Sequence, residues 1–462
     1  MAISKTAQPQ FNPYGDDEPT PKVGTGAWVA PTASGPLQAT VRLPGSKSLT
    51  NRELVLSALA DTPSLLKAPL HSRDSDLMIQ ALRDLGVSIQ DVPTVSEFGG
   101  DLLITPRPLE GGTSIDCGLA GTVMRFMPPV ASLALGPVAF DGDPSARRRP
   151  MRTTIDALRS LGVDVNDDGR GALPFSLYGT GSVAGGSIEI DASASSQFVS
   201  GLLLAAPRFV NGLRLRHSGR RLPSLPHIEM TIATLAARGI AVENPEPGLW
   251  IVPPASIQGI VVDIEPDLSN AAPFLVAAVV TGGSVTIAGW PSNTTQVGAQ
   301  LETLLPLFGA IVSRSDGALT ATGTGHIAGV TLDLSEAGEL APALVALAAL
   351  ADSPSRITGI AHLRGHETDR LAALAADLNG LGGAVTELDD GLSIEPRELH
   401  AGRWLSFEDH RMAMAGAIVG LVTSGVEIDD IGTTAKTLPQ FAELWSGMLG
   451  AAPRTVGSIG VL

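Results

Sequence analysis

One pattern recurs along the whole 462-residue chain. It consists of an amphipathic helix, a glycine that can cap the helix end, and a short β-branched strand. The clearest copies lie at 81–89 and 157–165, and weaker copies lie at 234–242, 303–312 and 377–385. The expected cap glycines are Gly86, Gly162, Gly239, Gly309 and Gly383, at intervals of 76, 77, 70 and 74 residues. This near-constant spacing predicts one structural unit repeated along the chain.

A sixth helix, at 441–449, ends before Gly450, another 67 residues on. After each of the first five copies the sequence predicts a further strand, at 113–116, 187–191, 260–263, 330–333 and 404–407. A nearly all-apolar helix follows in each unit, and such a helix belongs in the interior. These interior helices are expected to start near Ser48, Gly121, Ser196, Asn270, Glu339 and His410. Six units of this length divide into two α/β domains of three, because single cores seldom grow past about 250 residues.

The charge balance limits the partners of the chain. Its formal net charge is −16, with 31 basic and 47 acidic side chains. Nucleic acids and anionic membranes bind preferentially to basic protein surfaces, so neither is expected as a partner. An acidic protein can still bind a small anion if it gathers its few cations locally. Only five lysines are present, and Lys47 and Lys436 stand in the motifs described below.

The remaining composition favours a soluble cytoplasmic protein. The single cysteine, Cys117, excludes an internal disulfide and fits a reducing compartment. The chain start lacks a signal-peptide pattern, and the longest apolar stretches, such as 340–351, are shorter than the roughly 20 residues of a membrane span. Residues 1–24 are expected to form a disordered leader and 451–462 a tail. No cluster has metal-ligand spacing, so no metal or cofactor is expected.

Polar and cationic residues stand at the starts of the interior helices. A helix N-terminus offers unpaired N–H donors and a partial positive charge, so converging ends would form an anion site. Lys47, Ser48 and Arg52 stand at the first start, and a small-residue loop around Gly121 at the second. Three arginines ending at Arg149 precede another helix. Each group alone has a plain alternative: Ser196 could simply cap its helix, and the charged groups could form surface networks.

Taken in order, these residues resemble the 5-enolpyruvylshikimate-3-phosphate synthase family. The motifs that carry the resemblance span residues 43–439 and are Leu-Pro-Gly-Ser-Lys-Ser at 43–48, Ala-Gly-Thr-Val-Met-Arg at 120–125, Arg-Pro at 149–150, Ser-Ser-Gln-Phe at 195–198, Glu-Thr-Asp-Arg at 367–370, Asp-His-Arg-Met-Ala-Met at 409–414 and Ala-Lys-Thr-Leu-Pro at 435–439.

The resemblance implies transfer of the enolpyruvyl group of phosphoenolpyruvate to the 5-hydroxyl of shikimate 3-phosphate, in aromatic amino-acid biosynthesis. It implies two domains of three inverted α/β repeats with buried parallel helices, closing on substrates held between them. The N-terminal domain is expected at 46–264, and the C-terminal domain at 25–45 plus 265–450. We expect a monomer.

The family's functional residues map onto this sequence motif by motif. Those expected to carry the proton transfers are Glu339, Glu367 and Lys47. Those expected to bind shikimate 3-phosphate are Lys47, Ser48, Arg52, Ser195, Ser196, Gln197, Ser224, Glu339 and His366, with Arg52 on the carboxylate. Those expected to bind phosphoenolpyruvate are Lys47, Gly121, Arg149, Gln197, Arg370, Arg411 and Lys436, with Arg370 and Arg411 on the carboxylate.

The chain departs from the family pattern at four positions. Leu119 stands where many members have asparagine, His227 replaces a tyrosine, His366 replaces a lysine, and Glu339 is longer than the usual aspartate. These changes affect ligand details rather than the class of reaction. Because Gly121 has no side chain beside the phosphate, we expect inhibition by glyphosate, the family's familiar inhibitor at the phosphoenolpyruvate site.

Two other functions are alternatives to this prediction. The sister family, which acts on UDP-N-acetylglucosamine, usually has Lys-Asn where this chain has Lys47-Ser48, and a cysteine in the loop matching 141–149, where this chain has none. The second rival is a catalytically inactive, anion-binding copy of the fold. Retention of Lys47, Glu339, Glu367 and Lys436 together argues against it, because a protein that only binds anions has no need for two carboxylates, which weaken the binding of anions.

Overall fold

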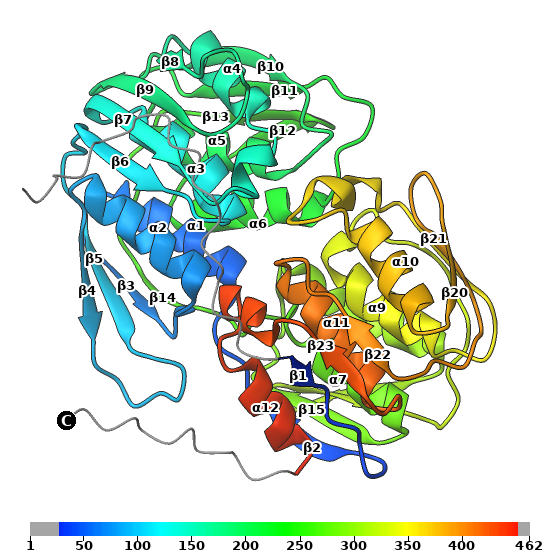
Figure 1. Cartoon of the computed structure of the whole chain (residues 1–462). Coiled ribbons are helices and arrows are strands. Elements are labelled where there is room, and N and C mark those ends of the chain that lie inside the picture. The colour runs from blue at the N-terminus through cyan, green and yellow to red at the C-terminus, as the bar shows by residue number, and fades with distance from the viewer. Residues whose placement is uncertain (1–26, 451–462) are drawn as a thin grey trace, which may run out of the picture.

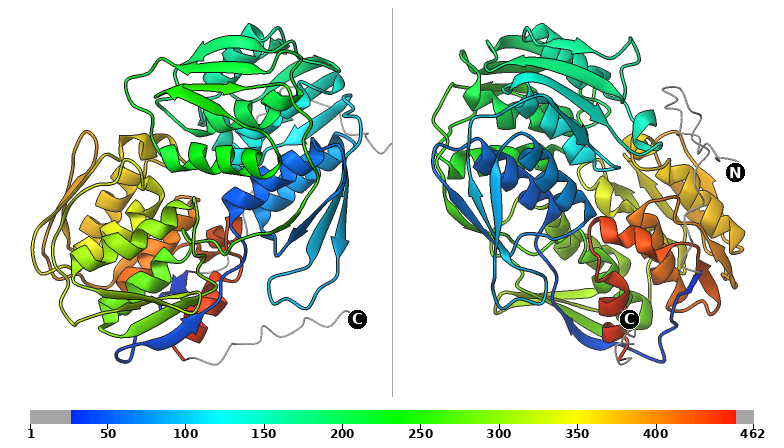
Figure 2. Two further views of the ribbon diagram at one scale, coloured as in Figure 1. Left: turned by 180° about the vertical axis from the view of Figure 1, so that it is seen from behind. Right: turned by 60° about the vertical axis from the view of Figure 1, so that its left-hand side comes forward.

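The computed structural model describes residues 27–450, so the predicted leader and tail lie outside the described residues. The elements form two lobes (Figure 1). The first lobe contains the elements from α1 to β14, and the second contains β1, β2 and the elements from α7 to α12. Figure 2 shows the same two lobes from behind and from the side.

Within the described residues the strands form six sheets, three in each lobe. The first-lobe sheets are, in strand order, β14 (Val261–Asp263), β3 (Ser64–Lys67), β5 (Asp101–Thr105) and β4 (Ser88–Val92); β6 (Thr113–Asp116), β7 (Leu135–Asp141), β9 (Phe175–Thr180) and β8 (Asp164–Asn166); and β10 (Gly186–Ile190), β11 (Leu213–His217), β13 (Leu249–Val252) and β12 (Glu243–Glu246). The second-lobe sheets are β2 (Gln38–Val41), β15 (Ser284–Ala288), β17 (Ala318–Thr322) and β16 (Ile311–Ser315); β18 (Thr331–Asp333), β19 (Ser355–Thr358), β21 (Leu392–Glu395) and β20 (Ala384–Glu387); and β22 (Gly402–Trp404), β23 (Val426–Ile428) and β1 (Trp28–Val29).

All six sheets share one topology. The first two strands in each order are parallel, and the remaining strands join antiparallel, as in β14–β3–β5–β4 and β2–β15–β17–β16. The sheet β22–β23–β1 follows the same rule with one strand fewer. This common topology confirms the repeat that the glycine spacing predicts, and the fold is α/β with three such units in each lobe.

Two helices accompany each sheet. In the first lobe they are α1 (Lys47–Ala58), α2 (Arg73–Asp84), α3 (Gly121–Ala131), α4 (Arg152–Ser160), α5 (Gln197–Ala205) and α6 (Leu225–Ala237). In the second lobe they are α7 (Ala272–Thr281), α8 (Leu301–Leu304), α9 (Ala341–Ala349), α10 (Arg370–Gly380), α11 (His410–Gly420) and α12 (Phe441–Met448). Short 3₁₀ turns are η1 (Ala146–Arg148), η2 (Ala206–Arg208), η3 (Val297–Gln300), η4 (Leu305–Phe308), η5 (Gly338–Leu340), η6 (Ala361–Gly365) and η7 (Ile431–Lys436).

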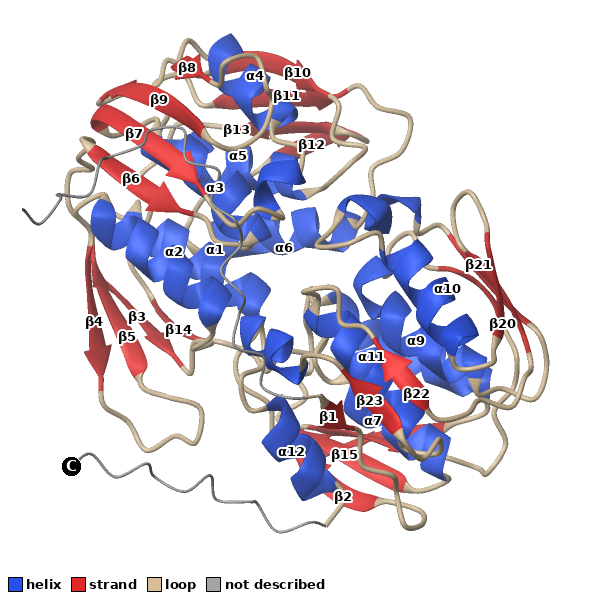
Figure 3. Cartoon of the chain, viewed as in Figure 1, coloured by secondary structure: helices blue, strands red, loops and turns tan. Residues whose placement is uncertain are grey.

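The interior helices are those that the apolar runs predict. Helices α1, α3 and α5 contact one another in the first lobe, and α7, α9 and α11 do so in the second. Their side chains are almost all buried. The sheets lie on the outer sides of the helices (Figure 3). This arrangement follows from hydrophobicity, because a helix that is apolar all round must be enclosed by other elements.

Two details of the predicted repeat are wrong. The fifth cap is Gly382, with φ of 90°, and not Gly383. Gly382 N donates to Asn379 O, as Gly86 N donates to Arg83 O in the first unit, so the first of two adjacent glycines takes the left-handed position. The strand predicted at 404–407 is displaced to β22, because the next N–H groups, of Leu405 and Ser406, donate to the side chains of Asp377 and Asp429 and not to a neighbouring strand.

The chain passes between the lobes at two adjacent places. β2 lies in the second lobe beside β15, and the chain then enters the first lobe at Ser46, whose N–H donates to Glu265 O at 2.8 Å. One buried apolar cluster extends from Leu54 to Ile264, and another combines 30–43 with 268–448. No helix between residues 27 and 450 is long and apolar enough to cross a membrane.

A buried ion pair joins the end of α6 to α1 in the first lobe. Arg238, at the end of α6, is 0% exposed and donates to Glu53 of α1 at 2.5 Å and to Ser57 at 2.8 Å. We expect Arg238→Ala to lower the free energy of unfolding by about 3–5 kcal/mol, because Glu53 would remain buried and unpaired. Urea denaturation measures this loss. The matched control is Arg208→Ala, which breaks the exposed Arg208–Asp61 pair and should cost less than about 1 kcal/mol; equal losses would contradict the prediction.

Candidate active site

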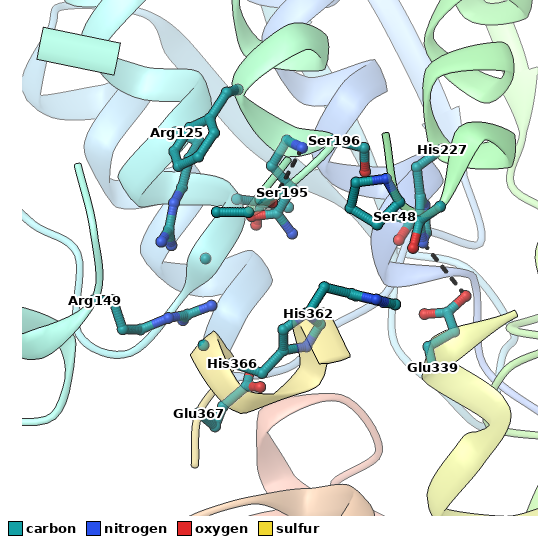
Figure 4. A pocket seen from close by; sticks show the side chains of 18 of the residues that line it. Ser48, Arg125, Arg149, Ser195, Ser196, His227, Glu339, His362, His366 and Glu367 are labelled. Carbon is teal, nitrogen blue, oxygen red and sulfur yellow. Dashed lines mark hydrogen bonds and ion pairs between the residues drawn. The ribbon is translucent and has the colours of Figure 1, made fainter. Parts of the chain in front are cut away.

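A cavity of about 420 Å³ lies between the two lobes. The first lobe contributes the starts of α1, α3 and α5, and the second contributes η5, η6 and the starts of α10 and α11. Figure 4 shows side chains from both lobes pointing into this space. The residues assigned from sequence that line it are Lys47, Ser48, Arg52, Gly121, Arg149, Ser195, Ser196, Gln197, Ser224, Glu339, His366, Glu367, Arg370 and Arg411. Lys436, the remaining one, contacts Glu367 just behind the lining.

Gly121 brings the start of α3 close to two other site residues. A Cβ added there would lie 3.0 Å from Gln197 Oε1 and 3.1 Å from Arg149 Nη2. Arg149 also donates from Nη1 to the carbonyl of Leu119 at 3.2 Å. The helix start, the guanidinium and the amide therefore surround one small space, which suits an anion because N–H groups and a positive charge face it.

A network of alternating charges lies on the second-lobe side. Glu367 accepts from Lys436 Nζ at 2.5 Å and from Arg370 Nη2 at 3.0 Å. Arg370 also donates from Nε to Asp409 at 2.7 Å. Burial would raise the pKa of Glu367, but Lys436 and Arg370 hold it well below its ordinary range. Burial lowers the pKa of Lys436, although the charge of Glu367 opposes this shift. In this network the two cations, Lys436 and Arg370, are balanced by two carboxylates, Glu367 and Asp409.

Lys436 also connects the lobes. It ends η7 in the second lobe, and its Nζ donates to the carbonyl of Leu119 in the first lobe at 3.1 Å. Arg149 donates to the same carbonyl. The two cations thus converge from opposite lobes on one oxygen beside the start of α3.

Glu339 is the second carboxylate of the cavity. Its Oε1 accepts from Ser269 at 2.7 Å, and its Oε2 accepts from Arg411 at 2.9 Å. His227 Nε2, from α6 of the first lobe, lies 3.5 Å from Oε1 (Figure 4). Burial opposes ionisation of this carboxyl, but His227, Arg411 and the Ser269 hydroxyl bring the pKa of Glu339 below its ordinary value. Glu339 is therefore ionised and can accept a proton.

The start of α1 supplies Lys47, Ser48 and Arg52. Lys47 Nζ lies 3.2 Å from Asp74, and Lys47 N donates to Asp267 at 3.1 Å. Arg52 is buried, and it donates to the carbonyls of Ser48 and His227 and to two hydroxyls. Burial lowers the pKa of Arg52 to about 10, which still leaves it charged at neutral pH.

The hydroxyl groups lie on the first-lobe side of the cavity. Ser195 Oγ accepts from Gln197 N at 3.2 Å, and Ser196 stands directly before α5. Ser224 stands before α6 with φ of 53°, and its N–H donates to Ser335 O of the second lobe at 3.2 Å.

His366 Nδ1 lies 3.3 Å from Arg370 Nη1, and burial and that neighbouring charge lower the pKa of His366 well below its ordinary range.

Sequence reasoning assigned no role to several residues that the structure places here. Asp409 is fully buried between Arg370 and the N–H of Arg411, and Ser269 bonds to Glu339. Arg125 and His362 line the cavity (Figure 4). Burial lowers the pKa of His362 to about 4. Asp409 and Arg125 were detectable as members of motifs, but Ser269 has no signal in the sequence. Among residues 27–450 no group of three His, Cys, Asp or Glu side chains could hold a metal ion.

Two lobes of three repeated units, with a cavity between them lined by cationic and hydroxyl groups, are the architecture of the enolpyruvyl transferase fold. The structure resembles an EPSP synthase from Acinetobacter baumannii with a TM-score of 0.74 and 26% sequence identity, covering 91% of this chain and 97% of that one. The enolpyruvyl transferase NikO from Streptomyces tendae shares the fold, with a TM-score of 0.72 and 17% identity over 92% of this chain and 97% of that one.

Sequence comparison narrows the class. The family model described as EPSP synthase (3-phosphoshikimate 1-carboxyvinyltransferase) matches residues 31–445. A 3-phosphoshikimate 1-carboxyvinyltransferase from Kocuria rhizophila is 57% identical over 430 residues, which are 92% of this chain and 97% of that relative. The chain therefore belongs to the EPSP synthase family. It is a transferase that moves the enolpyruvyl group of phosphoenolpyruvate to shikimate 3-phosphate in the shikimate pathway.

Proposed function

We propose that Glu339 is the general base of this reaction. It takes the proton of the 5-hydroxyl of shikimate 3-phosphate as that oxygen bonds to C2 of phosphoenolpyruvate. The observation that carries the assignment is an ionised carboxylate in the cavity, fixed by Ser269 at 2.7 Å and Arg411 at 2.9 Å. A carboxylate held in this way is oriented before the substrate arrives.

Lys47 and Glu367 are the pair that moves protons at the methylene carbon of phosphoenolpyruvate. One proton is added to that carbon as the new C–O bond forms, which gives a tetrahedral intermediate. The same pair then removes one proton from the resulting methyl group as the C–O bond to phosphate breaks, and the double bond is restored. The supporting observation is the position of Glu367, buried against the cations Lys436 and Arg370.

Phosphoenolpyruvate binds where cations from both lobes converge. Gly121, Arg149 and Lys436 hold its phosphate, and Arg370 and Arg411 hold its carboxylate. The support is the shared approach of Arg149 and Lys436 to the Leu119 carbonyl at the start of α3. Guanidinium groups match a planar carboxylate with two parallel hydrogen bonds, so arginine suits the carboxylate end.

Shikimate 3-phosphate binds on the first-lobe side. Ser195, Ser196 and Ser224 hold its phosphate, and Gln197 lies beneath its ring, also facing phosphoenolpyruvate. Lys47, Ser48 and His366 complete the pocket. Arg52 faces the carboxylate with its remaining Nη1 hydrogen, since its other donors already have protein partners.

We infer that the lobes are two domains, at 46–264 and at 25–45 plus 265–450, of which residues 25 and 26 lie outside the described residues. The two separate buried clusters support this division. The protein acts as a cytoplasmic monomer with small-molecule substrates and without a nucleic-acid partner. The net charge of −16 supports the last point.

Phosphate release tests the acceptor assignment. The protein is incubated with phosphoenolpyruvate and either shikimate 3-phosphate or UDP-N-acetylglucosamine, and released phosphate is measured. We expect release with shikimate 3-phosphate alone. Release with the sugar nucleotide alone would assign the chain to the sister activity, and no release from folded protein would favour the binding-only alternative.

Gly121→Ala tests the phosphate site. The added methyl group would lie 3.0–3.1 Å from Gln197 and Arg149, so one of them must move. We expect the KM for phosphoenolpyruvate to rise about tenfold, with the KM for shikimate 3-phosphate little changed. Steady-state kinetics measure both KM values. In the unmodified enzyme, glyphosate should inhibit competitively with phosphoenolpyruvate. Gly35→Ala, where a Cβ meets no atom within 4 Å, is the control; an unchanged KM in Gly121→Ala would contradict the assignment.

A further inference from the structure

His227 and Glu339 meet across the boundary between the lobes. His227 lies in the first turn of α6, whose apolar residues belong to the first-lobe core, whereas Glu339 lies in η5, next to the second-lobe core. His227 Nε2 is 3.5 Å from Glu339 Oε1, and each side chain is only 18% exposed. The two residues are 112 positions apart in the sequence, so folding alone makes this contact.

The two partners are held by different lobes. The carbonyl of His227 accepts from Arg52 Nη2 at 2.8 Å and from Thr231 Oγ1 at 3.0 Å. These hydrogen bonds fix the backbone from which the imidazole side chain extends in the first lobe. Arg411 donates to both the carbonyl and the carboxylate of Glu339, which fixes the glutamate in the second lobe. Small movements of the lobes therefore change the distance from His227 to Glu339 directly.

The Glu339 carboxylate can accept a further hydrogen bond at Oε1, the oxygen nearest to His227. Ser269 occupies one lone pair of Oε1 and Arg411 one of Oε2, while a carboxylate has about four such directions. The charged groups that face His227 are Glu339, Arg52, Arg411 and Lys47. Burial is the largest influence and lowers the pKa of His227; Glu339 opposes this shift, and the three cations add to it. The imidazole is therefore neutral at neutral pH, and one nitrogen can donate a hydrogen bond.

We propose that His227 is a positioning residue for the base: from the opposite lobe, its Nε2–H donates to Glu339 Oε1 and orients the carboxylate toward the acceptor hydroxyl when the lobes meet. The proposal rests on the proposed role of Glu339 as general base. According to this proposal, Glu339 is fully oriented for proton transfer only when the two lobes are closed around the cavity. A donor to the ionised carboxylate also lowers its pKa, so loss of this donor must raise that pKa.

Two substitutions of His227 separate this role from simple packing. His227→Gln places an amide nitrogen near the position of Nε2, whereas His227→Asn places it near Nδ1, too far back to reach Glu339. Both are polar and no larger than histidine, so both suit the fold. Thermal unfolding and calorimetric binding of shikimate 3-phosphate report on folding and on the site.

The expected result lies in the pH dependence of kcat/KM for shikimate 3-phosphate. In His227→Asn we expect kcat to fall about tenfold and the acidic limb to move about one pH unit upward, with the KM for phosphoenolpyruvate unchanged. His227→Gln should keep most of kcat and the original limb. An unmoved limb in His227→Asn, or equal behaviour of the two variants, would overturn the proposal.

Glu339→Gln in the same series separates this inference from the proposed function. If that variant is inactive and His227→Asn keeps the wild-type limb, the positioning role fails and the base assignment stands. If Glu339→Gln turns over normally, the base assignment fails, and the positioning role fails with it.

Discussion

Glu339→Gln should bind shikimate 3-phosphate and lose most of its turnover. Glutamine has nearly the same shape as glutamate, so the contacts to Ser269 and Arg411 can be kept. An amide cannot accept a proton at neutral pH, however, and the 5-hydroxyl would lose its base. We expect kcat to fall by about 10²–10⁴-fold, the contribution typical of general base catalysis. Steady-state kinetics measure the fall, and calorimetry measures the retained binding.

Ser269→Ala is the matched control for this variant. It removes a hydrogen bond to Glu339 but leaves the carboxylate in place, so kcat should fall less than about tenfold. Loss of shikimate 3-phosphate binding in Glu339→Gln would mean that the residue binds rather than catalyses. Turnover close to that of the unmodified enzyme would remove Glu339 from the base role.

The repeated unit was predictable because two physical requirements leave regular marks in the sequence. A helix that ends in the left-handed conformation favours glycine, and an interior helix is apolar on every face. Gly86, Gly162, Gly239 and Gly309 all have positive φ, as the spacing predicts. The exception arose where two glycines are adjacent, because composition cannot tell which of Gly382 and Gly383 takes the left-handed position. The end of β22 at Trp404 leaves no local mark, since it depends on hydrogen bonds to Asp377 and Asp429, which lie elsewhere in the sequence.

The residues that line the cavity of the candidate site were predictable as a set, but their contacts were not. The helix starts carry their own signal, since polar residues there interrupt apolar runs. The partners of those residues come from distant segments: Ser269 contacts Glu339, and Leu119 offers its carbonyl to Lys436. Such contacts depend on how six units pack, which no local pattern encodes. The contact between His227 and Glu339 also depends on this packing. In the sequence the two residues are only two separate departures from the family pattern.

Lys436→Met is expected to give the second large loss, and this loss should fall on phosphoenolpyruvate. Lys436 Nζ is buried between Glu367 at 2.5 Å and the Leu119 carbonyl at 3.1 Å. Methionine fills a similar volume without the charge. The phosphate then loses a charge-assisted hydrogen bond, and Glu367 is left with less neutralisation beside an anionic ligand. We expect kcat/KM for phosphoenolpyruvate to fall about 100-fold, consistent with about 1.5–3 kcal/mol for one such bond plus repulsion from Glu367.

The control for Lys436→Met is Lys67→Met, because Lys67 is a half-exposed lysine in β3 whose nearest carboxylate, on Asp263, lies 3.9 Å away. Its kinetics should match those of the unmodified enzyme, since an exposed pair at this distance contributes little. Calorimetry should show that Lys436→Met still binds shikimate 3-phosphate, because Lys436 is proposed to bind the other substrate. A change of less than about twofold in kcat/KM for phosphoenolpyruvate would exclude Lys436 from the phosphate site. A parallel loss of shikimate 3-phosphate binding would instead mean that Lys436 acts by holding the lobes together through Leu119.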